Sequence, residues 1–142
     1  MEIPKNIKNL LDNEKLCVMA TYLGNKSYLS LMNFTYLEAE NKIILSTRKS
    51  SKKYNNILLN SEVSLLVYSL PDGISATFEG TALTLDDQDA VRCRDLHYAK
   101  NNNMKQFIVG QEIGLILFKI QKIIISDSQD QVSYVCETPD AI

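Results

Sequence analysis

The chain has 142 residues, of which 45% are hydrophobic and 23% charged, and its formal net charge is −2. That length predicts a single domain over 1–142, with a core that needs neither disulfides nor a metal. The nearly balanced charge argues against wholesale binding to nucleic acid or to an anionic membrane, and no apolar run is long enough to span a bilayer.

The first elements, in chain order, are a helix and three strands. Apolar residues at helical spacing, with Pro4 suited to a first turn, predict a helix over about 3–13. The runs 16–22, 27–38 and 42–47 predict strands, and the turns between them are short. We therefore expect these three strands to form an antiparallel meander.

The remaining elements are two helices and four strands. A helix is expected over about 51–60, and another over 86–107, broken near the asparagine run 101–103. Gly80 is a candidate β-bulge. Strands are expected at 62–69, 74–85, 113–127 and 131–137. Short turns link most strands, so the pattern predicts a mainly β fold, an antiparallel barrel with flanking helices, and not a doubly wound sheet.

A compact basic cluster precedes the helix expected near residue 51. Four cations fall within six residues: Arg48, Lys49, Lys52 and Lys53. Ser50 or Ser51 can cap the helix, and the free N–H groups of its first turn with the helix dipole make an anion site. Lysines here oppose the dipole, and a bound phosphate would remove that conflict. The alternative is a solvated loop with ordinary surface lysines.

The stretch "IILSTRKSSKKYNNILLNSEVSLLV" resembles the pyridoxamine 5'-phosphate oxidase-like family of FMN-binding split barrels. The matching pieces are Ser46-Thr47, Ser51-Lys52-Lys53, Ile57 and Asn60-Ser61-Glu62-Val63. Ser61 stands where the family usually has proline, which weakens a helix stop but no ligand contact. The resemblance implies a mainly β, antiparallel split barrel of the FMN-binding type.

The resemblance also implies a cofactor site. Lys52 and Lys53 would bind the FMN phosphate, with Ser51 and Arg48 beside them. The hydroxyl pair Ser46-Thr47 would lie near the phosphate or the ribityl chain. Asn33 would contact the flavin ring; the alternative for Asn33 is an inward polar side chain bonded to the backbone.

The family's vitamin B6 enzyme has a C-terminal segment rich in Arg, Trp and Pro, whereas this chain has no Trp and ends in "SYVCETPDAI". The resemblance therefore implies a short relative: an FMN-dependent oxidoreductase that moves electrons between a reduced nicotinamide donor and an unidentified small molecule. The alternatives are a non-catalytic flavin, deazaflavin or haem binding or storage protein, and a nucleic-acid or regulatory module, which the charge disfavours.

Assembly and compartment are further expectations. Family members pack two barrels around the flavin, so we expect a homodimer in which the phosphate is held by one chain and the ring meets the 86–107 region or last strands of the other. Cys17, Cys93 and Cys136 are scattered, which suits a reducing cytoplasm. The chain's one histidine, His97, argues against a metal site, and we interpret its spacing from Cys93 as coincidence and not as a catalytic pair.

Overall fold

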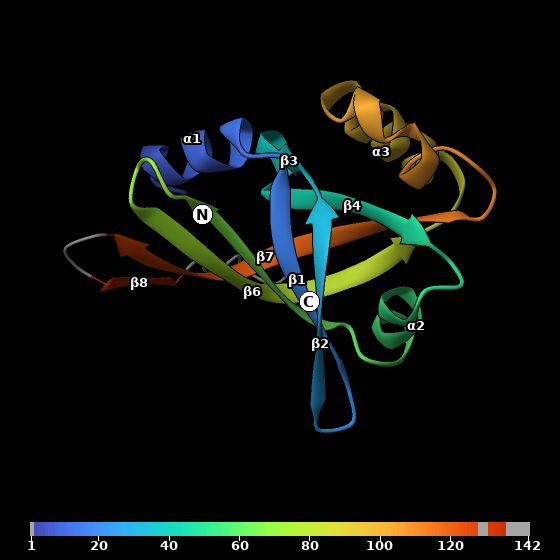
Figure 1. Ribbon diagram of the computed structural model, residues 1–142, viewed down its shortest axis with the longest axis horizontal. Coiled ribbons are helices and arrows are strands. Elements are labelled where there is room, and N and C mark those ends of the chain that lie inside the picture. The colour runs from blue at the N-terminus through green and yellow to red at the C-terminus, as the bar shows by residue number, and fades with distance from the viewer. Residues whose placement is uncertain (1, 128–130, 136–142) are drawn as a thin grey trace.

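The computed structural model describes residues 2–127 and 131–135. These residues form an antiparallel sheet that curls into a split β-barrel, with helices packed around it (Figure 1). The order along the sheet is β2-β1-β5-β6-β7-β4-β3, and β8 pairs with β7. The strands are β1 (Leu16–Leu23), β2 (Lys26–Asn33), β3 (Thr35–Leu37), β4 (Lys42–Arg48), β5 (Glu62–Ser69), β6 (Ile74–Leu85), β7 (Ile113–Asp127) and β8 (Gln131–Val135). The predicted fold class is confirmed.

The core fills the inside of the barrel. Side chains alternate between buried and exposed positions along β1 and β5, as a strand with one face on a core requires. Phe34, Phe78 and Phe118 are fully buried, and each such side chain contributes roughly 1.5–3 kcal/mol of transfer free energy. Helix α1 (Lys5–Asn13) joins this core through Ile7 and Leu11.

The segment predicted as one strand over 27–38 is two strands, and this corrects the expected meander. β1 and β2 form a hairpin, and β3 pairs with β4, but β2 and β3 lie at opposite ends of the sheet order. Between them Phe34 is buried, and its N–H donates to the Lys15 carbonyl at 3.2 Å. The chain thus passes from one sheet edge to the other at Phe34, which turns a flat meander into a curled barrel.

The bulge expected near Gly80 is present, with the extra residue on the neighbouring strand. Glu79 is opposite Lys122 and Gly80 is opposite Ile120, so β7 carries an extra residue at this point. A Cβ on Gly80 would overlap the carbonyl oxygen of β7 and lie 3.0 Å from Phe118 Cζ. Glycine is required here because the two backbones approach each other closely.

Two helices flank the sheet at the side where the basic cluster lies. Helix α2 (Lys52–Leu59) begins after Ser51, and α3 (Asp87–Lys100) is followed by the 3₁₀ segment η2 (Asn102–Phe107). The predicted break of the 86–107 helix is therefore confirmed at Asn101. No helix among the described residues is long and apolar enough to cross a membrane.

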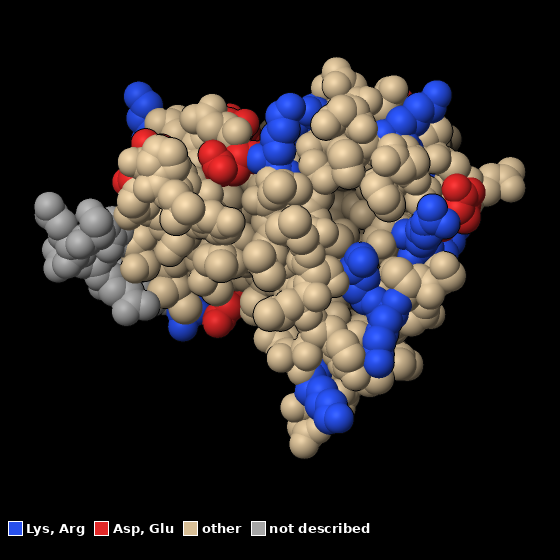
Figure 2. All heavy atoms as spheres, viewed as in Figure 1, with Lys and Arg blue, Asp and Glu red and all other residues tan. Residues whose placement is uncertain are grey.

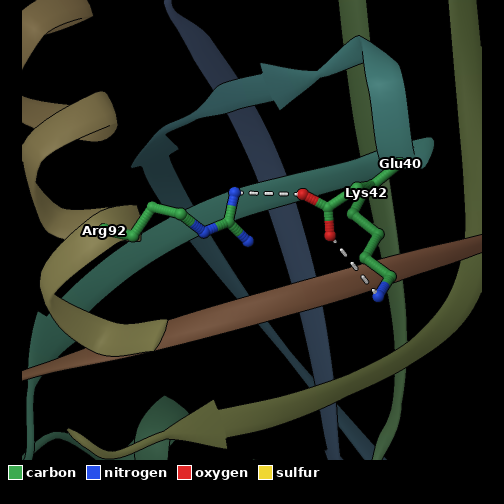
Figure 3. A network of polar contacts seen from close by, with 3 residues as sticks. All are labelled: Glu40, Lys42 and Arg92. Carbon is green, nitrogen blue, oxygen red and sulfur yellow. Dashed lines mark hydrogen bonds and ion pairs between the residues drawn. The ribbon is translucent and has the colours of Figure 1, made fainter. Parts of the chain in front are cut away.

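Helix α3 is held against the sheet by apolar packing and by an ion-pair network. Ala90 and Cys93 pack on Ile44 of β4. Glu40 of the 3₁₀ turn η1 (Glu38–Glu40) accepts from Arg92 Nη1 at 3.1 Å and lies 3.9 Å from Lys42 Nζ (Figure 3). Exposed ion pairs of this kind add little stability, so the apolar contacts of Ala90 and Cys93 do more than this network to hold α3 on the sheet.

Candidate functional site

A cavity of about 240 Å³ lies where three stretches far apart in sequence meet. Its walls come from the end of β2, the end of β4, the start of α2 and the α3–η2 region. In Figure 2 Lys and Arg side chains gather over α2 and the end of β4, beside a hollow below α3. Pockets that enclose a drug-sized ligand have roughly 300–1,000 Å³, so these walls enclose only a portion of a cofactor-sized molecule.

The basic end of the cavity lies at the start of α2. Arg48, Ser51 and Lys53 all line it. Ser51 is the N-cap of α2: its Oγ accepts from the Tyr54 N–H at 3.3 Å and from Thr47 Oγ1 at 3.4 Å. Because Ser51 Oγ already accepts twice, its own proton is left to donate to a ligand. Two cations, a hydroxyl and the first N–H groups of a helix together suit an anion.

Lys52 is the one expected site residue that does not line the cavity. Its Nζ lies 4.2 Å from the centroid of the Tyr28 ring, in cation–π geometry. Adjacent residues in a helix point about 100° apart, so the two lysines point in different directions. Lys53 lines the cavity, and Lys52 lies over Tyr28 of the β1–β2 hairpin. The sequence indicated both lysines because linear spacing does not tell which side of the helix faces the sheet.

Ser46 and Thr47 line the cavity as expected, but they already have partners. Ser46 Oγ donates to the Phe107 carbonyl at 2.7 Å, which fixes the end of η2 over β4. Thr47 donates to Ser51 and thereby orients the cap of α2. Both hydroxyls thus shape the cavity walls, and Ser51 is the hydroxyl whose proton remains for a ligand.

Another portion of the cavity lining is a polar wall, of which the sequence predicted Asn33 but not His97, Asn101 or Thr35. His97 and Asn33 line it, and both bond to Asn101: Asn33 Nδ2 donates to Asn101 Oδ1 at 3.0 Å, and Asn101 Nδ2 lies 3.3 Å from His97 Nδ1. Thr35 Oγ1 is 2.7 Å from the same His97 nitrogen. The alternative for Asn33 was a hydrogen bond to the backbone, and the structure shows a bond to the Asn101 side chain.

Burial controls the charges near this wall. His97 is 1% exposed, and burial, followed by the nearby Lys100 cation, lowers the pKa of the imidazole to about 4. Burial also lowers the pKa of Lys100 to about 8, although this ammonium donates to the Leu11 carbonyl at 3.1 Å and lies 4.1 Å from the Phe34 ring centroid. At neutral pH His97 is therefore an uncharged donor or acceptor.

The Cys93–His97 pair remains without support as a catalytic unit. Cys93 packs into a separate apolar cluster with Ile44 and Ala90, and it does not line the cavity. Burial raises the pKa of its thiol, which keeps it protonated at neutral pH. Across the described residues, no group of three or more His, Cys, Asp or Glu side chains is arranged to hold a metal ion. Cys136 lies outside the described residues.

Comparison with known proteins gives one family. A family model described as pyridoxamine 5'-phosphate oxidase matches residues 3–125. A Schizosaccharomyces pombe protein, named as a pyridoxamine 5'-phosphate oxidase homolog, is 32% identical over an alignment of 165 positions, gaps included, that covers 90% of this chain and 87% of the relative.

Solved structures at low identity share the fold. A haem-binding protein from Mycobacterium smegmatis superposes with a TM-score of 0.77 at 13% identity. The superposition covers 95% of this chain and 60% of that protein. A FAD-binding protein from Mesorhizobium loti superposes with a TM-score of 0.73 at 15% identity, covering 84% of this chain and 89% of the other.

Proposed function

This chain belongs to the pyridoxamine 5'-phosphate oxidase family, and we propose that it is a flavoprotein that binds FMN in the cavity between β2, β4, α2 and α3. The observation that carries the proposal is the basic end of the cavity. There Arg48, Ser51 and Lys53 surround the start of α2, and each can donate to a phosphate monoester. The rest of the lining is apolar or uncharged, which suits a flat ring.

The proposed reaction is electron transfer between a reduced nicotinamide donor and an unidentified small molecule. The flavin would supply the hydride chemistry. The chain's own residues would bind the phosphate and orient the ring, and none of the described residues that line the cavity is a carboxylate. We place the protein in the cytoplasm because its cysteines are scattered and the two described ones, Cys17 and Cys93, are free and buried.

Titration of apoprotein with FMN and with riboflavin tests the phosphate site. Lys53→Ala should weaken FMN affinity by roughly tenfold to a hundredfold, because a hydrogen bond to a charged group is worth about 1.5–3 kcal/mol. Riboflavin affinity should change much less, since it has no phosphate. Lys52→Ala is the matched control: its Nζ lies over Tyr28, so FMN affinity should stay within about threefold of the parent. Equal losses in both variants would contradict the assignment.

Storage without turnover is the alternative to an enzyme. A yellow colour, with flavin released on denaturation, is expected for an enzyme and for a storage protein alike. Bleaching of the flavin absorption by NADH or NADPH, and its recovery in air, supports the oxidoreductase; a spectrum unchanged by either donor supports storage. A deazaflavin would be recognised by its shifted absorption maximum in the released cofactor.

Haem fits this cavity less well than flavin. A histidine that ligates a metal normally donates its other ring N–H to an acceptor. Here His97 Nδ1 faces the donors Thr35 and Asn101, which favours hydrogen on Nε2, the nitrogen that would have to ligate iron. Haem titration without a Soret shift is the expected result.

We also propose that two copies of the chain complete the site. Asn33, Leu31 and Leu29 share the outer face of the β1–β2 hairpin, because alternate residues of a strand point to one side. Leu31 lines the cavity and is 66% exposed, and Leu29 is 73% exposed. An apolar strip that continues from a cavity too small for a whole cofactor suits a second copy of this chain across a twofold axis.

Sedimentation at low micromolar concentration tests the assembly. Leu29→Glu should give monomers and weaken FMN binding, because the partner would no longer cover the cavity. Leu70→Glu is the control: this side chain is 81% exposed in the turn after β5 and does not line the cavity. A parent protein that is monomeric with flavin bound would refute the shared site.

A further inference from the structure

The polar wall of the cavity carries one hydrogen-bond donor and one acceptor without a partner among the described residues. Both ring contacts of His97 are made by Nδ1, to Thr35 and Asn101, so Nε2 is the nitrogen left for the cavity that His97 lines. Asn33 uses its Nδ2 on Asn101, and its Oδ1 is left in the same way. No fully buried side-chain nitrogen or oxygen of the described residues lacks a partner, so both atoms are accessible from the cavity, where a ligand can bond to them.

The orientation of Asn101 determines which His97 nitrogen carries the hydrogen. Asn101 Nδ2 lies 3.1 Å from the His97 carbonyl and 3.4 Å from the Phe34 carbonyl. Carbonyl oxygens only accept, so the amide nitrogen and not the amide oxygen must face them. The same Nδ2 is 3.3 Å from His97 Nδ1, and this contact is a hydrogen bond only if Nδ1 carries no hydrogen and accepts.

Thr35 completes this assignment. Its hydroxyl accepts from Asn101 Nδ2 at 3.2 Å and lies 2.7 Å from His97 Nδ1, to which it donates when Nδ1 carries no hydrogen. The imidazole is uncharged at neutral pH, because burial lowers its pKa to about 4. The single hydrogen therefore sits on Nε2.

We propose that His97 Nε2–H and Asn33 Oδ1 together bind the lactam edge of a heteroaromatic ring, where a ring N–H adjoins a carbonyl. Nε2–H donates to the carbonyl and Asn33 Oδ1 accepts from the N–H. This rests on the proposed function: the pyrimidine ring of a flavin has such an edge. The basic end at α2 and this wall line one cavity, so a ligand held by its phosphate at α2 can reach the wall with its ring.

The first experiment reads the tautomer without any cofactor. The chain has one histidine, so uniformly ¹⁵N-labelled, untagged apoprotein gives one imidazole signal pair that needs no assignment. The expected result at neutral pH is a neutral ring with hydrogen on Nε2. A ring with hydrogen on Nδ1, or a doubly protonated ring, would overturn the proposal. Thr35→Val should weaken the preference for the Nε2–H tautomer, because it removes the shorter of the two donors to Nδ1.

The second experiment changes the ligand and leaves the protein intact. N3-methyl-FMN has the phosphate and ring of FMN but lacks the N–H of the lactam edge. The parent should bind it about tenfold or more weakly than FMN, because Asn33 Oδ1 is left unpaired. Asn33→Ala should bind both flavins with nearly equal affinity. Discrimination that persists in Asn33→Ala, or its absence in the parent, would overturn the assignment.

Two variants test the donor. His97→Met removes the N–H and should lower FMN affinity by about threefold to tenfold, and His97→Gln, which restores an N–H donor at a similar distance, should recover some of that loss. Failure of Gln to exceed Met would argue against Nε2 as a donor. If apoprotein binds no flavin at all, the proposed function fails; if it binds FMN and N3-methyl-FMN equally, only this assignment fails.

Discussion

Acid should destabilise this protein through His97 before its carboxylates titrate. His97 is 1% exposed, and its pKa falls from 6.5 to about 4 in the folded state because burial disfavours the imidazolium. As pH falls, the unfolded chain binds the proton first, near pH 6.5. The contribution of neutral His97 to the free energy of unfolding is therefore fully present above about pH 6.5. It decreases as the pH falls from about 6.5 to about 4.

The size of the effect follows from the two pKa values. Linkage gives a loss of about 2 kcal/mol between about pH 7 and pH 5, and about 3 kcal/mol once the pH is below 4. The charged group facing His97 is Lys100, which adds to the shift but stays protonated throughout this range. The carboxylates are the same in the parent and in a variant changed only at His97, so a comparison of the two proteins isolates the contribution of His97.

Urea denaturation at the two pH values measures this loss in the parent and in His97→Gln. The variant loses the Thr35 and Asn101 contacts at every pH, so its stability is lower throughout, but it lacks the histidine titration. The parent should therefore lose about 2 kcal/mol more than the variant over the same interval. Equal losses in both proteins would refute the reasoning, and so would an NMR titration of His97 with a pKa near 6.5.

Three further substitutions test the elements that position the cavity. Gly114→Ala would place a Cβ 2.7 Å from Tyr54 Cζ, so it should displace α2 and lower both FMN affinity and stability, the latter by about 1–3 kcal/mol; unchanged FMN affinity would contradict this. Ser51→Ala removes the cap of α2 and should cost about 1 kcal/mol in urea denaturation, whereas Ser50→Ala, at an exposed position, should cost little. Gly80→Ala would overlap the backbone of β7 and should lower stability by at least about 2 kcal/mol; an unchanged melting temperature would show that the bulge can relax.

The sequence predicted the basic end of the site because that end is local in the chain. Ser51 caps α2 as the Ser-Lys-Lys spacing indicated, and the strand before it and the helix after it lie close to their expected bounds. Cap chemistry and apolar periodicity depend on neighbours within a few residues, so one sequence contains them. The side on which each lysine lies depends on how α2 packs on the sheet, so the sequence did not indicate that Lys52 lies over Tyr28, outside the cavity lining.

Of the polar wall, only Asn33 was predicted as a site residue, because the tertiary fold alone brings Asn33 beside the other members. Thr35 and His97 are 62 residues apart, and Asn33 and Asn101 are 68 apart. The only local signal was the asparagine run, which predicted the end of a helix. It gave no indication that the Asn101 side chain bonds to Asn33, Thr35 and His97. The strand predicted over 27–38 concealed the crossing at Phe34, and that crossing brings Asn33 and Thr35 beneath α3.

The basic end of the cavity and the polar wall therefore differ in how easily their residues can be substituted. The basic end depends on a helix start and its cap, which a short segment specifies by itself, whereas the polar wall depends on side chains from β2, β3 and α3 that must agree with one another. Replacing one member of that wall leaves buried polar atoms unpaired, at a cost of about 1–3 kcal/mol each, so the wall must change as a unit. If FMN binds as proposed, a barrel of this fold could keep its phosphate site while the residues around the ring are replaced for another ligand. In this chain those residues would be Asn33 and His97, which Asn101 joins to each other and to Thr35.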